Sequence, residues 1–208
     1  VDAMAGDVRA LLDAERIERA VLCGHSLGGK VAMALALSDP VRVERLIVLD
    51  MAPVAYELDD GSGWDESARL VDACARLDVG AVANKGDADR QLARVVGSPG
   101  LRNFMLMNLV RRSSGRGFAW RINIGGTQRA LPEIARWNAD DAGVSEPYGG
   151  NTLFVAGGKS RYLRSSHLLS ISQHFSRFSI TTIRNADHWI HADEPEALLL
   201  IVSNFLAV

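Results

Sequence analysis

Residues 24–28 read Gly24-His25-Ser26-Leu27-Gly28 and form a G-x-S-x-G pattern. In this pattern a serine sits on a tight turn between a strand and a helix, with its hydroxyl exposed as a nucleophile. The turn brings the chain too close to itself for a Cβ, so we expect both glycines to be required. A chain of this length matches the bare pattern by chance about one time in fifteen. The apolar strand-like and helix-like segments on either side of Ser26 favour the catalytic interpretation.

A serine nucleophile needs a general base, and the sequence contains five histidines. His188 follows the last expected strand, where loops gather at the carboxyl edge of a parallel sheet. It is the preferred base, partly because of the resemblance given below, and His191 is the alternative. We expect His25 to line the substrate pocket or to pack within the turn. His167 and His174 fall in an amphipathic helix and are interpreted as surface or hydrogen-bonded residues.

The base in turn needs a carboxylate that orients it. The common position is the loop after the penultimate strand, but residues 157–162, GGKSRY, contain no Asp or Glu. Asp50 ends the strand after the serine turn, and one βαβ step places it at the same sheet edge as Ser26. Asp50 is therefore the predicted acid, with a turn or helix-capping role as its alternative. Asp187 directly precedes His188, so its side chain is expected to point away from the imidazole.

The backbone N–H of Leu27 lies at the start of the helix behind the serine. Free N–H groups and the helix dipole favour negative charge there, so this N–H is predicted to form half of an oxyanion hole. Substrate-pocket walls are expected from several apolar and aromatic side chains. For the candidates between residues 104 and 120, a place in the hydrophobic core of the inserted segment is an equally good interpretation. The pocket candidates are His25, Met51, Phe104, Met105, Met107, Trp120 and Trp189.

Hydrophobic periodicity predicts the elements that position these residues. Residues 2–14 form an amphipathic helix pattern, and the continuous apolar run 20–24 fits an interior parallel strand. A buried helix is expected at 31–37. The remaining expected strands lie at 43–49, 152–156 and 178–184, and the remaining helices at about 164–174 and 194–206. Asp193 and Glu196 are interpreted as a capping box for the last helix.

Strands that alternate with helices predict an α/β fold, with a mostly parallel sheet and helices on both faces. Residues 54–147 interrupt the alternation with short helical segments separated by Gly- and Ser-rich joints. They predict a helical cap inserted after the strand that follows the serine turn. The expected core parts are residues 1–53, with the nucleophile, and 148–208, with the histidine.

Composition excludes several classes of protein. The chain has 208 residues, 48% of them hydrophobic, and a formal net charge of -2. The charge balance gives no electrostatic reason to expect nucleic acid, and no apolar run reaches the roughly 18 residues of a membrane span. Cys23 and Cys74 are too few for a disulfide framework, and Cys23 is expected to be buried. The first residues show no signal-peptide pattern, so we expect a cytoplasmic location.

With these motifs the chain resembles the α/β-hydrolases, and more narrowly the YbfF-type short-chain esterases and their abhydrolase-domain relatives. The resemblance implies hydrolysis of short acyl esters, sometimes thioesters, without a metal or cofactor. It also implies Ser26 as nucleophile, His188 as base and Asp50 as acid, with Asp187 where the family usually has glycine. The matching stretches are GHSLGGKVAM (24–33), LIVLDMAPV (46–54), FMLMNL (104–109), FAWRINI (118–124), TLFVAGGKSRYL (152–163) and NADHWIHADEP (185–195).

The resemblance implies further that the first strands of the sheet and a His-Gly loop precede Val1. That loop supplies the second oxyanion donor in such hydrolases, and nothing like it lies before residue 24. Without those strands, residues 20–24 would form an exposed apolar edge. Losing one oxyanion donor typically lowers the rate about 100- to 1000-fold. We therefore expect low activity, or none, from this chain by itself.

Two further functions stay open. The first keeps the same three residues but acts on acyl-CoA thioesters, on carbon–carbon bonds or as a haloperoxidase, since one fold hosts many reactions. A basic rim from Arg111, Arg112 and Arg116 would suit a CoA thioester. The second is a truncated, non-catalytic binding module of hydrolase-like fold. Oligomeric state does not follow from the sequence.

Overall fold

The computed structural model describes residues 1–58, 61–113, 115, 117–137 and 146–207. The chain divides into two compact units. We call Val1–Tyr56 with Arg136–Val208 the sheet unit, and Glu57–Ala135 the inserted unit. The insertion is narrower than the expected 54–147, because Tyr56 and Trp137 pack inside the sheet unit. The Tyr56 hydroxyl donates to Tyr162 O, and the Trp137 indole N–H donates to His174 Nε2.

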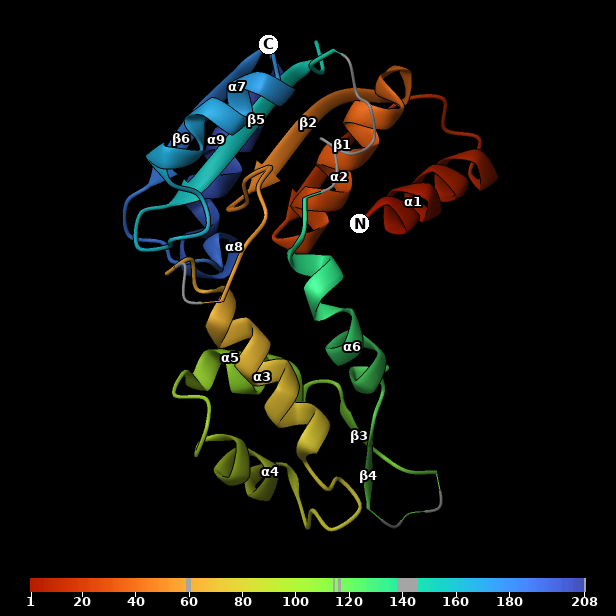
Figure 1. Cartoon of the computed structure of the whole chain (residues 1–208), viewed down its shortest axis with the longest axis vertical. Helices are drawn as coiled ribbons and strands as arrows, with labels where there is room; N and C mark the ends of the chain where they lie inside the picture. The colour runs from red at the N-terminus through yellow and green to blue at the C-terminus, as the bar shows by residue number, and fades with distance from the viewer. Residues whose placement is uncertain (59–60, 114, 116, 138–145, 208) are drawn as a thin grey trace. The chain divides into compact units, whose positions relative to one another are not determined.

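The sheet unit contains a four-stranded parallel sheet in the order β1-β2-β5-β6 (Figure 1). The expected α/β architecture is confirmed, but the interior position expected for residues 20–24 is wrong for the described residues. Strand β1 lies at the sheet edge and pairs with β2 alone, which leaves Val21 and Cys23 exposed. The burial expected for Cys23 is wrong for the same reason. The strands are β1 (Ala20–His25), β2 (Val43–Leu49), β5 (Asn151–Gly157) and β6 (Phe178–Ile183).

Helices cover both faces of this sheet. Helix α2 (Leu27–Ser38) is buried over most of its length and packs on the face that carries Val48, while α1 (Asp2–Ala14) packs against α2. Helix α9 (Pro195–Ala207) packs on the other face, against Ile47 and Val155. The remaining elements of the unit are the short helical turns η1 (Pro40–Arg42), η2 (Ser165–His167), α7 (Leu168–His174) and α8 (Ile190–Asp193).

The capping box expected for the last helix is not formed. Helix α9 begins at Pro195, and Asp193 is the last residue of α8. The Asp193 carboxylate accepts the backbone N–H of Asp187 at 2.8 Å. It therefore holds the loop that precedes His188 and does not cap α9.

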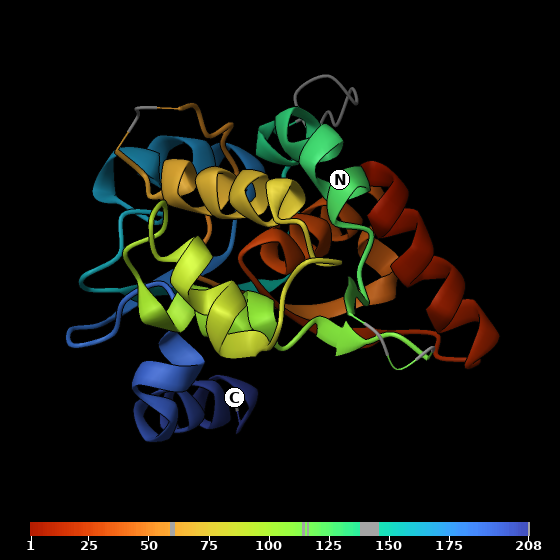
Figure 2. The same cartoon turned by 90° about the horizontal axis from the view of Figure 1, so that it is seen from below.

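The inserted unit has its own apolar core, which includes Cys74, Leu92 and Leu109. Helix α3 packs against α6, and β3 pairs antiparallel with β4. Figure 2 shows α3 lengthwise, in yellow-orange. The elements are α3 (Trp64–Arg76), α4 (Lys85–Leu92), α5 (Pro99–Leu106), β3 (Leu109–Arg111), β4 (Phe118–Trp120) and α6 (Ile124–Ala135). In the parts of the chain that the structure describes, no helix has the length and apolarity needed to cross a bilayer.

Lys30 on α2 is a lysine buried inside the sheet unit, with 1% of its surface exposed. Its ammonium donates to the carbonyl of Arg136 at 3.0 Å and lies 4.8 Å from the centre of the Tyr56 ring. These two residues stand where the chain returns to the sheet unit and where it leaves it. Burial lowers the pKa of Lys30 to about 8, because the charged form loses its hydration.

This burial predicts a pH-dependent stability. Between pH 8 and 10.5 the unfolded chain binds more protons at Lys30 than the folded chain, so the free energy of unfolding rises with pH. The rise amounts to at most about 3 kcal/mol at 1.36 kcal/mol per pKa unit. Denaturant unfolding of Lys30→Met across this range is expected to lack the rise, whereas Lys85→Met, which changes an exposed lysine, keeps it. Parallel curves for wild type and Lys30→Met would contradict the assignment.

Candidate active site

Ser26 stands on the turn between β1 and α2 in a backbone conformation that is rare for a side-chain-bearing residue, with φ 54° and ψ -123°. Its N–H donates to Leu49 O at 3.1 Å, which ties the turn to the end of β2. A Cβ on Gly24 would lie 2.2 Å from Gly28 O, so this position admits only glycine. The same requirement expected for Gly28 is wrong, since a Cβ there would meet nothing within 4 Å.

His188 lies between Ser26 and Asp50. Its Nε2 is 3.0 Å from Ser26 Oγ, and its Nδ1 is 2.8 Å from Asp50 Oδ2. A carboxylate oxygen only accepts, so the proton of the neutral imidazole sits on Nδ1 and Nε2 is left to accept the serine proton. The structure thus brings together the three residues that the sequence nominated, at distances that allow proton transfer.

Asp50 is fully buried and receives three donors. Besides His188 Nδ1–H, the N–H of Gly157 donates to Oδ1 at 3.0 Å, and the hydroxyl of Ser160 donates to Oδ2. The Ser160 oxygen also accepts the N–H of Tyr162 at 3.2 Å, which leaves its own proton for Asp50. Three donors stabilise the ionised carboxylate at a position that has no exposed surface.

Sequence reasoning missed Ser160. The expected position for the acid, the loop after β5, contains no carboxylate. The loop instead supplies hydroxyl and N–H donors to a carboxylate from the neighbouring strand. Segment 157–162 contains no Asp or Glu but does contain a serine. That hydroxyl was the one hint in the sequence of a donor to the acid.

Two glycines let the loop after β5 approach the loop that carries the base. A Cβ on Gly157 would lie 2.4 Å from Asp187 O, and one on Gly158 would lie 2.5 Å from Arg184 O. Asp187 itself is exposed, and its carboxylate accepts the backbone N–H of His188 at 2.8 Å. Asp187 therefore contacts the backbone of the base, whereas Asp50 contacts its ring.

Aromatic rings surround the His188 imidazole. Tyr162 stacks on it with ring centres 4.0 Å apart, and the His25 ring lies 4.7 Å away. Burial, with the neighbouring His188 ring as the next cause, lowers the pKa of His25 to about 4. The His25 ring also lies 6.0 Å from the half-buried Trp189 and 4.9 Å from His191, which is exposed.

The remaining expected site residues of the sheet unit take these positions. Leu27 is the first residue of α2, where a backbone N–H has no acceptor within the helix. Met51 is buried directly after Asp50. His174 is hydrogen-bonded at both ring nitrogens, and His167 accepts the N–H of Arg164.

The pocket candidates of the inserted unit divide into exposed and core residues. Phe104 and Met107 are exposed, with 40% and 60% of their surfaces accessible. Met105 belongs to the core of the unit, and Trp120 packs against that core, with its indole N–H donating to Cys74 O at 3.1 Å. Met105 and Trp120 thus have a structural role within their own unit.

The arginines considered for a basic rim are engaged within the β3–β4 hairpin. Arg111 lies over the Phe118 ring at 5.1 Å, and Arg112 Nε donates to Phe118 O at 2.9 Å. Arg116 lies outside the described residues.

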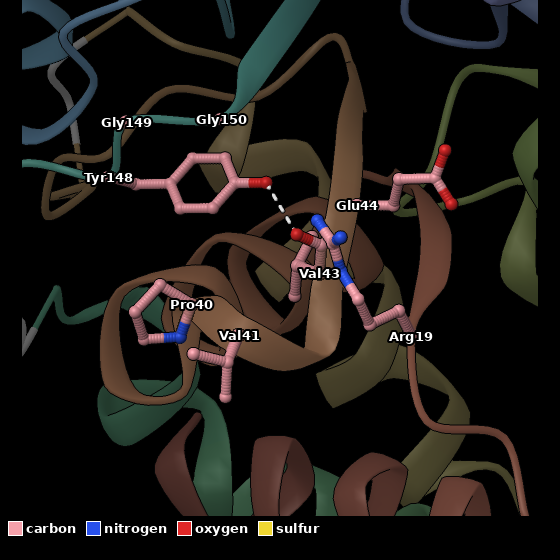
Figure 3. Close-up of a pocket in the computed structure, with 8 residues that line it drawn as sticks. All are labelled: Arg19, Pro40, Val41, Val43, Glu44, Tyr148, Gly149 and Gly150. Atoms are coloured by element: carbon pink, nitrogen blue, oxygen red, sulfur yellow. Dashed lines mark hydrogen bonds between the residues drawn. The ribbon is translucent and has the colours of Figure 1, made fainter.

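One hollow of the sheet unit lies at the amino ends of the strands, whereas Ser26 follows the carboxyl end of β1 (Figure 3). It has a volume of about 460 Å³ and sits at the amino ends of β2 and β5, where the Tyr148 hydroxyl donates to Val43 O at 3.0 Å. Parallel α/β proteins bind ligands at the carboxyl ends of their strands, so this hollow is not the candidate active site. Its lining residues are Arg19, Pro40, Val41, Val43, Glu44, Tyr148, Gly149 and Gly150.

Comparison with known proteins decides the family. The model of the alpha/beta hydrolase family matches residues 1–199. The chain belongs to this family. The expected α/β-hydrolase fold is thereby confirmed, and an esterase from a marine microorganism superposes with a TM-score of 0.91 at 28% identity, covering 98% of this chain and 76% of that one.

Two curated relatives of this alpha/beta hydrolase are named for ester-cleaving activities. The chain is 38% identical over 206 residues to the sn-1-specific diacylglycerol lipase ABHD11 of Mus musculus, covering 99% of this chain. It is 28% identical over 204 residues to the esterase YbfF of Escherichia coli, covering 98% of this chain and 74% of that relative. The chain spans 65% of the length of the mouse relative.

The glycine geometry yields a prediction for the serine turn. Gly24→Ala is expected to lower the free energy of unfolding by about 1–3 kcal/mol or more, because the added Cβ overlaps a backbone carbonyl. Gly28→Ala is the matched control at the other end of the motif and is expected to change it by less than about 1 kcal/mol. Equal losses in chemical denaturation would contradict the difference in space at the two positions.

Proposed function

We propose that this alpha/beta hydrolase cleaves short-chain carboxylic esters through an acyl-enzyme intermediate on Ser26. The observation that supports the proposal is the hydrogen-bonded line from Ser26 Oγ through His188 to the buried Asp50. A serine hydroxyl is a weak nucleophile unless an adjacent base removes its proton. Here the tautomer of His188 leaves Nε2 unprotonated and facing that hydroxyl.

In the acylation step Ser26 Oγ attacks the ester carbonyl carbon while its proton passes to His188 Nε2. The imidazolium that forms donates Nδ1–H to the Asp50 carboxylate, which stays ionised. The N–H of Leu27 donates to the developing oxyanion. When the tetrahedral intermediate collapses, the bond to the alkoxy group breaks and His188 returns the proton to the leaving alcohol.

In the deacylation step His188 removes a proton from water, and the resulting hydroxide attacks the acyl carbonyl. Collapse of the second intermediate releases the carboxylic acid, and the proton on Nε2 returns to Ser26 Oγ. The same three residues therefore serve both halves of the reaction, in which neither a metal nor a cofactor takes part.

The relatives support ester hydrolysis as the reaction class, since the two curated relatives are named as a lipase and an esterase. The near-neutral formal charge of -2 suits small uncharged substrates. Two of the arginines considered for a CoA thioester, Arg111 and Arg112, already contact Phe118. We therefore prefer a short ester over the thioester alternative.

The nucleophile assignment predicts the effect of Ser26→Ala on hydrolysis of p-nitrophenyl acetate and butyrate by the natural full-length protein. Loss of the nucleophile is expected to lower kcat by about 10⁴-fold or more with an unchanged fold. Ser172→Ala, which removes an exposed hydroxyl elsewhere, serves as control and keeps wild-type kcat. Equal rates for wild type and Ser26→Ala would show that another residue attacks the ester.

The acid assignment is tested by a pair of isosteric changes. Asp50→Asn is expected to lower kcat by about 10³- to 10⁴-fold, because the amide no longer favours the Nδ1–H tautomer of His188. Asp187→Asn leaves an acceptor for the backbone N–H of His188 and is expected to stay within about threefold of wild type. If only Asp187→Asn abolishes hydrolysis, Asp50 is not the acid.

A further inference from the structure

His25 makes a contact that the catalytic mechanism described above does not use. Its Nε2 lies 2.7 Å from the backbone carbonyl oxygen of His188. A carbonyl oxygen only accepts, so the proton of the neutral His25 ring sits on Nε2 and is donated to it. The lowered pKa of His25, about 4, keeps the ring neutral at physiological pH. The contact is therefore a hydrogen bond from a neutral imidazole to a backbone carbonyl.

This bond joins two segments that are far apart in sequence. His25 is the last residue of β1 and the neighbour of the nucleophile, whereas His188 lies in the loop after β6. The His188 ring reaches Ser26 from that loop, so the distance from Nε2 to the serine oxygen depends on where the loop backbone lies. His25 ends β1, and Ser26 follows it directly. The hydrogen bond from His25 therefore links the backbone of His188 to the strand end that carries Ser26.

Side chains engage both polar groups of the His188 backbone. Its N–H donates to Asp187 and its carbonyl accepts from His25. Asp187 is the adjacent residue and moves with the loop, and Asp193, which accepts the Asp187 N–H, belongs to the short helix that follows. Neither of these two contacts fixes the position of the loop relative to Ser26. The His25 bond does so, and it acts on the backbone, whereas Tyr162 and Asp50 act on the ring.

We propose that His25 is a positioning residue that holds the backbone of the general base His188 in register with the nucleophile Ser26. The proposal rests on the proposed function for the catalytic meaning of that register. His25 touches neither the reacting atoms nor the proton that is transferred. His25 is also a pocket candidate, but its removal is expected to affect kcat more than KM because it misplaces the base, and displacements near 1 Å cost about 100-fold in rate.

The experiment compares His25→Leu with His25→Gln in the natural full-length protein. Leucine fills similar space without a donor, whereas the glutamine amide N–H can take the place of Nε2–H. With p-nitrophenyl butyrate, His25→Leu is expected to lower kcat by about 10- to 100-fold with KM within about twofold of wild type. His25→Gln is expected to recover most of the loss.

A second readout does not depend on turnover. The His188 Nδ1–H proton shared with Asp50 gives a far-downfield proton NMR signal when the imidazole is held in place. This signal is expected to broaden or disappear in His25→Leu and to return in His25→Gln. If His25→Leu does not fold, His25→Asn takes its place, since its shorter amide does not reach the carbonyl.

The matched control is His174→Leu. His174 Nδ1 lies 2.7 Å from Ser170 O, so this variant also removes a histidine–carbonyl contact of the same length, outside the serine turn and the base loop. It is expected to lower the unfolding temperature while the NMR signal and kcat stay as in wild type. It thereby separates loss of stability from loss of register.

The outcomes distinguish the two proposals. If wild type does not hydrolyse esters, the proposed function fails, and the NMR signal alone still decides whether His25 holds His188. If wild type is active but His25→Leu keeps both its kcat and the downfield signal, the positioning role is overturned. A loss that His25→Gln does not recover also overturns it, because the donor would then not be what matters.

Discussion

The hydrogen bond between the Asp50 carboxylate and His188 Nδ1–H is the interaction on which the rest of the site depends. It selects the tautomer of the imidazole, which in the proposed mechanism leaves Nε2 to accept the proton of Ser26. The bond is made in a fully buried place, where an ionised carboxylate is costly unless donors surround it. Much of the local structure serves to supply those donors at the carboxyl edge of the sheet.

The parallel sheet explains how residues from distant parts of the sequence meet. Ser26, Asp50 and the Gly158–Ser160 loop follow β1, β2 and β5, and these strands are neighbours in the sheet. Ser26 and Asp50 both have positive φ, at 54° and 49°, which turns the chain sharply where each strand ends. Such strained conformations concentrate at functional sites, where the surrounding structure holds them in place. Glycines at 24, 157 and 158 then admit the close backbone approaches.

The sequence predicts the parallel sheet and nominates Ser26 and Asp50 because periodicity and motif spacing are local signals, whereas the choice of His188 rests partly on the family resemblance. The serine turn, the strand ending in Asp50 and the loop with His188 could each be recognised from a few adjacent residues. For Ser160 the sequence offers only a serine in a loop without carboxylates, because its bond to Asp50 exists only once β5 lies beside β2. The expected burial of Cys23 failed for a related reason, while the exposed edge expected for residues 20–24 without preceding strands agrees with the described sheet. An apolar run shows that a strand favours burial but does not show which neighbours it has.

The central claim is that Ser26 carries the acyl group during turnover. Mass spectrometry of the protein quenched after brief exposure to p-nitrophenyl acetate tests it most directly. The proposed mechanism predicts an acetyl adduct on the peptide that contains Ser26, and its accumulation when hydrolysis of the adduct is slowed. Continued ester hydrolysis with the adduct on another residue, or with no covalent adduct at any time point, would contradict it.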